Sequence, residues 1–461
     1  MLLSMEEFSA FEPKKPTYAL FGWPLGHTMS PELHAQLFEA SGQDADYIGV
    51  AVPPENLPEA FELAKRKLRG INCTIPHKKA VIDLLDEVDT TARDLHSVNT
   101  VAFRDGRAIG YNTDILGFAE SLTRDGVKLR GKKVLLLGYG GAAAVIAYHC
   151  ITQGAYLTIT GRHPDKAAVL QEQLCSAVPG AHVSVFSRRH IPRDIQIVLN
   201  STPVGMFPKE NVAPLHYLPH KTEYIFDAIY NPPVTATMKL ANPKKTRVRD
   251  GLFMLVMQAA HAQTIWSGVQ FTPQACETIL RRTYGKMAVK RLHEKHGKRN
   301  IVLCGFMGSG KTTVGRKLAR LTGLDFVDAD QYLEAQEGKQ ISEIFAERGE
   351  AYFRDRETAY IRELSQRDGI VLSLGGGAVL RPENVEAIKQ TGLLIHLDTP
   401  YFRILKNLSY SNTRPLLDKP DKQAETRRLY NARKGIYHRV SDISVRSPKI
   451  SEVLEKLVKS I

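Results

Sequence analysis

Short apolar runs alternate with longer segments of helical periodicity along most of this chain. The apolar runs lie at 18–21, 48–52, 133–137, 156–160, 301–304, 370–374 and 393–397. Continuous apolar runs of this length are typical of strands that are buried on both faces of a sheet. Helical patterns follow several of them, at 31–40, 57–67, 143–150 and 314–321. Strands that alternate with helices predict an α/β fold.

The length and charge of the chain limit its class. At 461 residues it is longer than one ordinary hydrophobic core, so we expect two or three domains. The net charge of +13 is spread without a basic tail, which suits pockets for anionic small molecules as well as it suits nucleic acid. No nucleic-acid motif occurs, so small-molecule partners are favoured.

Cysteine usage indicates a reducing compartment. The five cysteines are scattered, odd in number and without a C-x-x-C pair, which argues against a disulfide framework or a zinc site. The N-terminus lacks the apolar core of a signal peptide, and no apolar run approaches the length of a membrane span. We therefore expect a cytoplasmic protein with no membrane partner.

A glycine loop follows the apolar run at 301–304 and precedes the helical pattern at 314–321. It reads Gly305-Phe-Met-Gly-Ser-Gly-Lys-Thr-Thr313 and fits G-x-x-x-x-G-K-[ST], the P-loop of ATP-binding proteins. Lys311 would reach the terminal phosphates and the Thr312 hydroxyl would bind Mg²⁺. The alternative, a glycine turn that only links strand to helix, is disfavoured by the Lys-Thr pair. The predicted nucleotide contacts are Gly305, Gly308, Ser309, Gly310 and Thr313.

A second glycine loop lies between the apolar runs at 133–137 and 156–160. It has the G-x-G-x-x-A spacing of a dinucleotide-binding βαβ unit, and its predicted cofactor contacts are Gly138, Gly140, Gly141 and Ala142. After the second strand, NAD-specific folds place an acid on the ribose, whereas an Arg suits a 2′-phosphate. Here the sequence is Gly161-Arg162-His163 and contains no acid. The sequence therefore predicts NADP as cofactor.

Polar residues follow the N-terminal apolar runs. Ser30 precedes Pro31, which suits the start of a helix, and we expect Ser30 to be its N-cap. Beyond capping, the hydroxyls of Thr28 and Ser30 could bind a carboxylate. Further polar clusters occur in Asn72-Cys-Thr74-Ile-Pro-His-Lys78, Ser97-Val-Asn99-Thr100 and Asn112-Thr-Asp114.

These segments together resemble the shikimate dehydrogenase family over about residues 15 to 285. The resemblance continues through 200–206, 227–232 and 251–259, in family order. It implies that Lys78 and Asp114 lie at the reacting oxygen of 3-dehydroshikimate, with NADP(H) as cofactor. Lys78 would stabilise the alkoxide and donate a proton. The other residues matched to ligand-binding positions are Thr28, Ser30, Thr74, Asn99, Tyr230 and Gln258 for substrate, and Met206 and Gly251 for cofactor.

This sequence departs from the family pattern at several positions. Thr28 replaces the usual Ser, Cys73 replaces Val, and Gln263 stands where an aromatic is common. Gly161-Arg162-His163 occupies the place of Asn-Arg-Thr. None of these departures removes a reacting group. A surface Lys–Asp pair with no catalytic role is the alternative reading of Lys78 and Asp114.

The C-terminal part, about 299 to 461, resembles shikimate kinase. Beyond the P-loop it has Asp328-Ala-Asp330, which we expect on one face of a strand, then F-R-x-x-E at Phe353–Glu357, Gly375-Gly-Gly377 and Arg414-Pro-Leu-Leu417. The resemblance implies Mg²⁺ near Asp328 through water, proton acceptance or hydroxyl orientation by Asp330, and stabilisation of phosphoryl charge by Arg414. It assigns shikimate to Asp330, Arg354, Gly376, Gly377 and Arg433. Lys406-Asn407 lies where the family tends to have an Arg, and Gly435 where Pro is common.

The sequence thus predicts a fused enzyme in which the product of the first module, shikimate, is the substrate of the second. The expected parts are a substrate domain at 1–116 completed by helices at about 251–285, a Rossmann NADP domain at 117–250, a linker at 286–298 and a P-loop kinase domain at 299–461. Two alternatives stay open: a dehydrogenase that also accepts quinate, and a fusion in which one module only binds ligand. An oligomer is possible but cannot be predicted.

Overall fold

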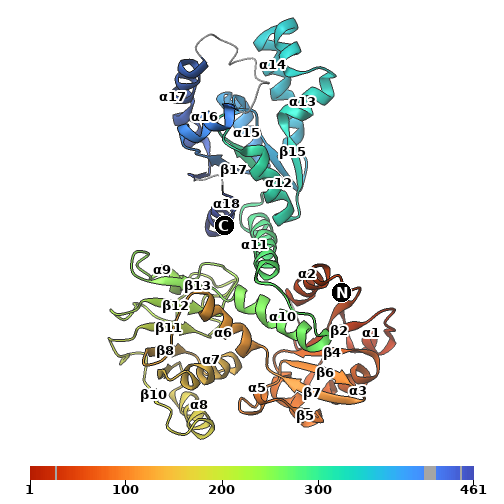
Figure 1. Ribbon diagram of the computed structural model, residues 1–461, viewed down its shortest axis with the longest axis vertical. Coiled ribbons are helices and arrows are strands. Elements are labelled where there is room, and N and C mark those ends of the chain that lie inside the picture. The colour runs from red at the N-terminus through yellow and green to blue at the C-terminus, as the bar shows by residue number, and fades with distance from the viewer. Residues whose placement is uncertain (26–27, 410–421, 447–448, 461) are drawn as a thin grey trace. The chain divides into compact units, whose positions relative to one another are not determined.

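The computed structural model describes residues 1–25, 28–409, 422–446 and 449–460. Within these residues the chain divides into two compact units, Met1–Leu280 and Arg281–Ile461 (Figure 1). Both units contain largely parallel sheets covered by helices, as the apolar pattern predicts. The α/β fold class is confirmed.

The first sheet is mixed and belongs to the N-terminal part of the first unit. Its strands β2, β3 and β4 are parallel, whereas β6 runs antiparallel to β4 and β7 antiparallel to β6. In spatial order the strands are β1 (Leu2–Leu3), β3 (Asp46–Ala51), β2 (Thr17–Gly22), β4 (Gly70–Cys73), β6 (Thr100–Arg104), β7 (Arg107–Tyr111) and β5 (Glu87–Val88). The helices of this part are α1 (Met5–Ala10), α2 (Ser30–Ser41), α3 (Leu57–Lys67), α4 (His77–Ala80) and α5 (Thr90–Arg93).

The second sheet is parallel throughout and has the strand order of a dinucleotide-binding fold. In spatial order its strands are β10 (Val183–Val185), β9 (Tyr156–Thr160), β8 (Lys133–Leu137), β11 (Ile197–Asn200), β12 (Tyr224–Asp227) and β13 (Arg247–Arg249). From β8 the successive strands β9 and β10 lie on one side and β11, β12 and β13 on the other, so the strand order switches between β8 and β11, where doubly wound sheets bind their ligands. The helices here are α6 (Asp114–Arg124), α7 (Gly141–Thr152), α8 (Pro164–Ala177), α9 (Ala236–Lys239) and α10 (Leu252–Ser267).

Helices α6 and α10 pack closely inside the first unit (Figure 1). The contact depends on Gly117, because a Cβ there would lie 2.5 Å from the backbone oxygen of Met254 and 3.0 Å from the nitrogen of Gln258. Real Cβ atoms do not approach backbone so closely, so glycine is needed at this crossing. Because α6 begins at Asp114 and α10 carries Gln258, the crossing fixes the helices that hold two predicted site residues.

The second unit has a parallel sheet of its own. Its strands, in spatial order, are β15 (Asp325–Asp328), β16 (Ile370–Ser373), β14 (Asn300–Cys304), β17 (Gly392–Leu397) and β18 (Ile443–Val445). Strands β15 and β16 lie on one side of β14 and strands β17 and β18 on the other, so the strand order switches at β14, the strand that leads into the P-loop. The helices that follow are α12 (Lys311–Thr322), α13 (Ala329–Glu337), α14 (Ile341–Ser365), α15 (Pro382–Thr391), α16 (Tyr401–Ser409), α17 (Lys422–Val440) and α18 (Ile450–Ser460).

The segment 286–298, expected to be a helix extension plus linker with a boundary near Gly297, is mostly helical. Helix α11 spans Pro273–His296. The compact units divide at Leu280 and Arg281, before the expected boundary. This part of α11 belongs to the second unit because Ala288 and Leu292 are buried in its hydrophobic core. The basic residues around them make this apolar pair difficult to recognise in the sequence.

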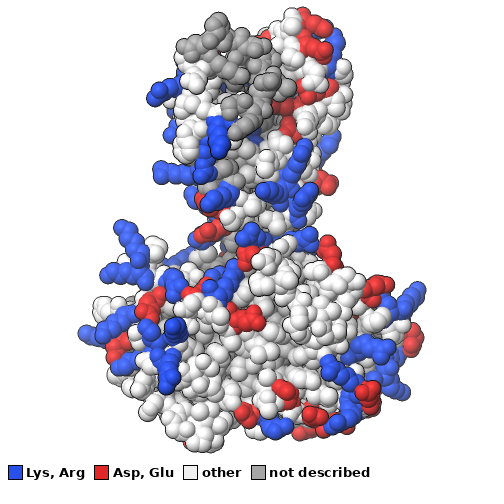
Figure 2. Space-filling model, viewed as in Figure 1, with Lys and Arg blue, Asp and Glu red and all other residues white. Residues whose placement is uncertain are grey.

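Charge is dispersed over the face of the molecule seen in Figure 2. Lys and Arg side chains there are interspersed with Asp and Glu rather than joined in one continuous stripe. Among the described residues, no helix is both long enough and apolar enough to cross a membrane.

Candidate active sites

Several of the predicted catalytic and substrate residues of the first unit lie at one edge of the first sheet. Thr74 and Lys78 follow the carboxyl end of β4, which is parallel to β2, the strand before Thr28. Asn99 precedes the antiparallel β6, and Asp114 follows β7. Because β6 runs against β4 and β7 against β6, all these positions lie at the same edge.

Lys78, Asp114 and Asn99 form one hydrogen-bonded group at this edge. Lys78 Nζ donates to Asp114 Oδ2 at 2.5 Å, and Asn99 Nδ2 donates to Asp114 Oδ1 at 2.9 Å. The side chains of Lys78 and Asp114 are 25% and 15% exposed. A pair this enclosed, yet reachable, differs from a solvated surface pair. The group can present a charged proton donor to a ligand.

A buried polar network that sequence reasoning missed holds this group. Asn72 Nδ2 donates to the backbone oxygen of Asn99 and to Thr100 Oγ1, and Tyr47 OH donates to Asn72 Oδ1 at 2.7 Å. Asn112 Oδ1 accepts the backbone N–H of Asp114 at 3.1 Å. The Asn residues stand inside the quoted motifs, so their positions were visible in the sequence. Their supporting contacts were not visible.

Thr28 and Ser30, the two predicted carboxylate-binding hydroxyls, lie at the start of α2. Thr28 Oγ1 donates to Ser30 Oγ at 3.3 Å and accepts the backbone N–H of Ser30 at 3.2 Å. Ser30 is the first helical residue of α2 and Met29 is the cap residue, so the prediction that Ser30 is the N-cap is wrong. The reason is that Thr28 already accepts the Ser30 N–H, which leaves both hydroxyls at the start of α2.

The cofactor loop lies at the carboxyl edge of the second sheet. Gly138 follows β8 with φ of 115°, a conformation that L side chains rarely adopt, and a Cβ there would lie 2.6 Å from Ser201 Oγ. Gly140 is the N-cap residue of α7, and Gly141 and Ala142 are the first two residues of that helix. Within the described residues, and apart from chain neighbours and the backbone of α7 itself, no heavy atom lies within 4 Å of a Cβ built on Gly140 or Gly141, so the backbone is open to a ligand.

The other predicted cofactor residues, Arg162, Met206 and Gly251, and the predicted substrate residue Tyr230 follow neighbouring parallel strands. Arg162 is exposed directly after β9, where a ribose 2′-phosphate would lie. Met206 is 47% exposed in the loop after β11, and Tyr230 is largely enclosed after β12. Gly251 precedes α10, and a Cβ there would clash with the backbone oxygen of Ala228. These residues thus follow strands of the same parallel sheet.

Asp227 is a further residue of this edge that sequence reasoning did not assign. It is fully buried, accepts from Asn200 Nδ2 at 2.9 Å and Thr235 Oγ1 at 2.7 Å, and accepts the backbone N–H of Ile229 at 3.1 Å. Burial raises the pKa of Asp227 to about 6, despite the hydrogen bonds from Thr235 and Asn200. The carboxyl joins the loops that follow β11 and β12, and these carry Met206 and Tyr230.

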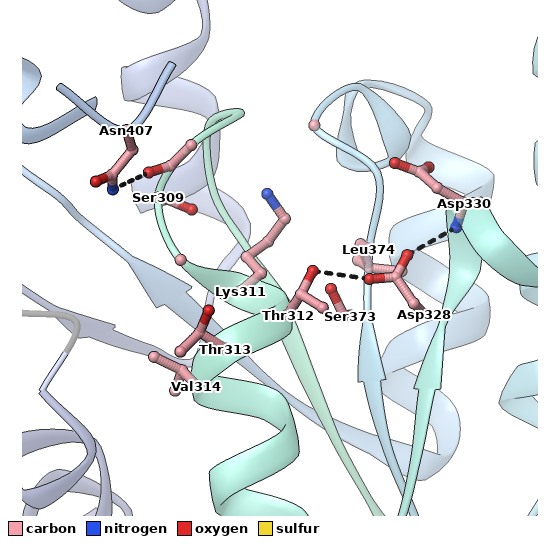
Figure 3. A pocket seen from close by; sticks show the side chains of 13 residues that line it. Ser309, Lys311, Thr312, Thr313, Val314, Asp328, Asp330, Ser373, Leu374 and Asn407 are labelled. Atoms are coloured by element: carbon pink, nitrogen blue, oxygen red, sulfur yellow. Dashed lines mark hydrogen bonds between the residues drawn. The ribbon is translucent and has the colours of Figure 1, made fainter. Parts of the chain in front are cut away.

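A pocket of about 450 Å³ lies at the carboxyl edge of the sheet in the second unit. The P-loop and the start of α12 form one wall, and Asp328 and Asp330 lie opposite (Figure 3). Lys311 Nζ bonds the P-loop carbonyls of Gly305 at 2.9 Å and Phe306 at 3.1 Å. The pocket lining contains predicted nucleotide, metal and substrate residues: Gly308, Ser309, Gly310, Lys311, Thr312, Thr313, Asp328, Asp330 and Gly376.

Thr312 and Asp328 have the chemistry of a magnesium site. Thr312 Oγ1 donates to Asp328 Oδ2 at 2.9 Å (Figure 3). Oxygen ligands of this kind suit Mg²⁺, which usually keeps several waters. Asp330 differs from the prediction, because β15 ends at Asp328 and Asp330 lies in the first turn of α13. Asp328 caps that helix by accepting the Asp330 N–H at 3.2 Å, which turns the chain out of the strand.

The glycines after β16 allow charged groups to approach the backbone. A Cβ on Gly375 would lie 2.6 Å from Asp330 Oδ1, and one on Gly377 would lie 2.5 Å from Arg354 Nη1. Arg354 Nη1 donates to Glu357 Oε2 at 2.7 Å. Burial raises the pKa of Glu357, and the Arg354 guanidinium opposes that rise. Asp330, Arg354 and the glycine loop are therefore brought together, as the sequence predicts.

Helix α17 contributes Arg433 and, one turn later, Tyr437. Tyr437 is buried and its hydroxyl donates to the backbone oxygen of Gly376 at 2.5 Å. Burial raises the pKa of Tyr437, and the neighbouring Arg433 opposes that rise. Sequence reasoning missed Tyr437, although it lies only one turn beyond Arg433. Arg414 lies outside the described residues.

Asn407 explains one departure from the kinase pattern. Its Nδ2 donates to the backbone oxygen of Gly308 at 2.8 Å, so the side chain braces the P-loop (Figure 3). The sequence alone predicts only an altered nucleotide contact at this position. The structure adds a bond to the loop itself.

Comparison with known proteins assigns both units. The family model described as the substrate-binding domain of shikimate dehydrogenase matches residues 20–101, and the shikimate kinase family model matches residues 307–461. A shikimate dehydrogenase (NADP(+)) of Carboxydothermus hydrogenoformans is 39% identical over 254 residues, which are 54% of this chain and 91% of the relative.

Solved structures agree for the first unit. Shikimate 5-dehydrogenase from Thermus thermophilus, in complex with NADP(H) and shikimate, has a TM-score of 0.53 and 31% identity, over 58% of this chain and 99% of that one. A 5-ketofructose reductase of Gluconobacter has a TM-score of 0.52 and 31% identity, over 59% and 99%. The chain belongs to the shikimate dehydrogenase family and carries a shikimate kinase domain at its C-terminal end.

Proposed function

We propose that the chain is a bifunctional enzyme that reduces 3-dehydroshikimate to shikimate with NADPH and phosphorylates shikimate with ATP. The observation that carries this proposal is that each unit holds its reacting groups at one sheet edge. The first has Lys78 bonded to Asp114 at 2.5 Å, and the second has Lys311 and the Thr312–Asp328 pair in one pocket. The product of the first reaction is the substrate of the second.

In the reductase, bound NADPH supplies the hydride. Lys78 stabilises the negative charge that develops on the ketone oxygen and donates a proton to it. Asp114 orients the ammonium through their hydrogen bond and accepts from a substrate hydroxyl. Asn99 keeps Asp114 in place through the Nδ2 bond to Oδ1.

In the kinase, MgATP supplies the phosphoryl group. Lys311, which bonds the P-loop carbonyls here, would bind the terminal phosphates, and Thr312 with Asp328 would hold the metal. Asp330 accepts or orients the proton of the attacking hydroxyl, and Arg354 binds the shikimate carboxylate. Such a reaction depends mainly on positioning and charge neutralisation, which these residues provide.

The test follows both activities in one purified protein. With 3-dehydroshikimate, NADPH and MgATP we expect NADPH loss and shikimate 3-phosphate formation, and without ATP we expect shikimate alone. The same fold serves a 5-ketofructose reductase, so fold alone does not fix the ketone. Equal catalytic efficiency with 5-ketofructose, or with quinate in the oxidative direction, would contradict the substrate assignment. Absence of phosphorylation with intact reduction would mean that the kinase module only binds ligand.

A further inference from the structure

The ring of Tyr139 packs against Gly161, a position where this chain has glycine and the dehydrogenase pattern has Asn. Tyr139 stands in the cofactor loop between Gly138 and Gly140, and Gly161 follows β9. A Cβ built on Gly161 would clash with Tyr139 Cε1 and lie 2.7 Å from Cδ1. The ring also packs against the hydrophobic core of this sheet, which fixes its position. Tyr139 and Gly161 therefore form a steric pair, in which the ring occupies the place of a side chain at 161.

Polar groups without protein partners gather around this pair. Tyr139 Cζ, which bears the hydroxyl, lies 3.7 Å from the Cβ built on Gly161, so the hydroxyl reaches the carboxyl end of β9. His163 meets the Tyr139 ring edge to face, with centroids 6.4 Å apart. Within the described residues, neither the Tyr139 hydroxyl nor the Arg162 guanidinium forms a hydrogen bond or an ion pair with the protein. These donors remain available to a ligand.

We propose that Tyr139 is a specificity-determining residue of the cofactor site, whose hydroxyl donates to the ribose 2′-phosphate of NADP(H) beside Arg162. Arg162 alone is an exposed donor on a long side chain after β9. A phenol fixed by the core adds a second donor with little conformational freedom to lose. Gly161 is glycine because the ring needs its space. This inference rests on the proposed function, in that the first unit uses NADP(H).

The first test measures binding of adenosine fragments by titration calorimetry, so that turnover is not the readout. In the wild-type protein, 2′,5′-ADP should bind more tightly than 5′-AMP. Tyr139→Phe should weaken 2′,5′-ADP binding about tenfold, since a hydrogen bond to a charged group is lost, and leave 5′-AMP binding unchanged. Tyr156→Phe is the matched control, because Tyr156 lies on β9 at the opposite end of the strand.

The outcomes separate the inference from the function on which it rests. If wild-type protein binds both fragments equally, the NADP assignment fails. If 2′,5′-ADP is preferred but Tyr139→Phe leaves that preference unchanged, the role of Tyr139 is overturned.

The second test examines the steric pair. Gly161→Ala should lower the midpoint of thermal unfolding in the wild-type background and leave it nearly unchanged in Tyr139→Ala protein, where the ring is absent. Trp23 and Trp266, the two tryptophans of the chain, both lie in the first unit, so their fluorescence follows its unfolding. If Gly161→Ala lowered the midpoint of thermal unfolding equally in both backgrounds, the Tyr139 ring would not be the reason that position 161 requires glycine.

Discussion

At the residue scale, reactivity depends on groups that are enclosed but still reachable. Lys78 and Asp114 are neither fully buried nor solvated, and Asn99 donates to the carboxylate oxygen that Lys78 leaves free. Asp227 illustrates the opposite case, a carboxyl with no exposure whose hydrogen bonds hold loops together. Each makes a measurable prediction.

Lys78→Ala should lower the reductase kcat by about 10²- to 10⁴-fold and leave phosphorylation unchanged, since the proton donor and charge stabiliser is lost. Lys79→Ala is the matched control, because Lys79 is the exposed neighbour on the same short helix. The measurement is NADPH oxidation with 3-dehydroshikimate beside a separate kinase assay. Near-normal reduction by Lys78→Ala, or an equal loss in Lys79→Ala, would refute the role.

Asp227→Asn should alter how stability depends on pH. The pKa is raised from 3.8 to about 6 by burial, so between these values the folded protein binds more protons than the unfolded chain. The contribution of Asp227 to the free energy of unfolding is therefore fully present below the unfolded pKa of 3.8 and lost as pH rises through about 6. From about pH 4 to about pH 7, the wild-type value should fall by roughly 2 kcal/mol relative to the variant.

Urea unfolding of the first unit, followed by tryptophan fluorescence at several pH values, measures this difference. Asp194→Asn is the control with the opposite sign, because a hydrogen bond from Lys133 lowers the pKa of that exposed carboxyl. A difference between wild type and Asp227→Asn that does not change with pH would contradict the prediction.

At the scale of elements, each site forms from the loops that follow parallel strands, and neighbouring helices hold those loops through additional contacts. Helix α17 shows this in the second unit. It carries Arg433, and its Tyr437 bonds the oxygen of Gly376, so one helix is tied to the glycine loop predicted to bind shikimate. The ring of Tyr437 also stacks on His396 of β17, with centroids 5.3 Å apart.

Tyr437→Phe should raise the KM for shikimate roughly 2- to 10-fold in the kinase reaction, with the KM for ATP nearly unchanged, since one buried hydrogen bond to the substrate loop is lost. Tyr430→Phe is the matched control on the same helix, where the ring contacts Phe306 and Tyr401. Steady-state kinetics with each substrate varied in turn provide the measurement. An equal rise in both KM values would indicate a general loss of structure instead of a positioning role.

At the scale of the whole molecule, each activity has its own compact unit with its own sheet and core. Lys311→Met should therefore abolish phosphorylation while reduction keeps its normal kcat and KM. Lys317→Met, an exposed position on the same helix α12, serves as control. A fall of both activities in a folded Lys311→Met protein would mean that the units are coupled.

Free diffusion of shikimate between the two sites is expected as well. Exposed charges are screened over about 8 Å at physiological ionic strength, so surface guidance of an anionic intermediate is weak. Unlabelled 3-dehydroshikimate is supplied in the presence of labelled shikimate, and the label in shikimate 3-phosphate is measured. Product that carries label in proportion to the mixed pool supports diffusion, and product that excludes it would show direct transfer.

The sequence by itself determined the α/β class and both glycine loops, and it supplied the candidates for the reacting groups. Motif residues are constrained by local backbone needs and by ligand chemistry, which short segments such as Gly305–Thr313 retain in full. The strands at 133–137 and 156–160 agree with β8 and β9 to the residue, because continuous apolar runs between glycine turns leave few alternatives.

Only the tertiary structure decided which side chains support those groups. Asn72, Asp227 and Tyr437 act through partners far away along the chain, at Asn99, Asn200 and Gly376, and no local pattern records such pairings. The strand position of Asp330 was wrong because capping by Asp328 turns the chain into α13, and the burial of Ala288 and Leu292 in the second unit likewise depends on what packs nearby. In the sequence, Gly161 looks only like the loss of the Asn side chain that the family usually has there. In the structure, the ring of Tyr139 occupies the space of that side chain.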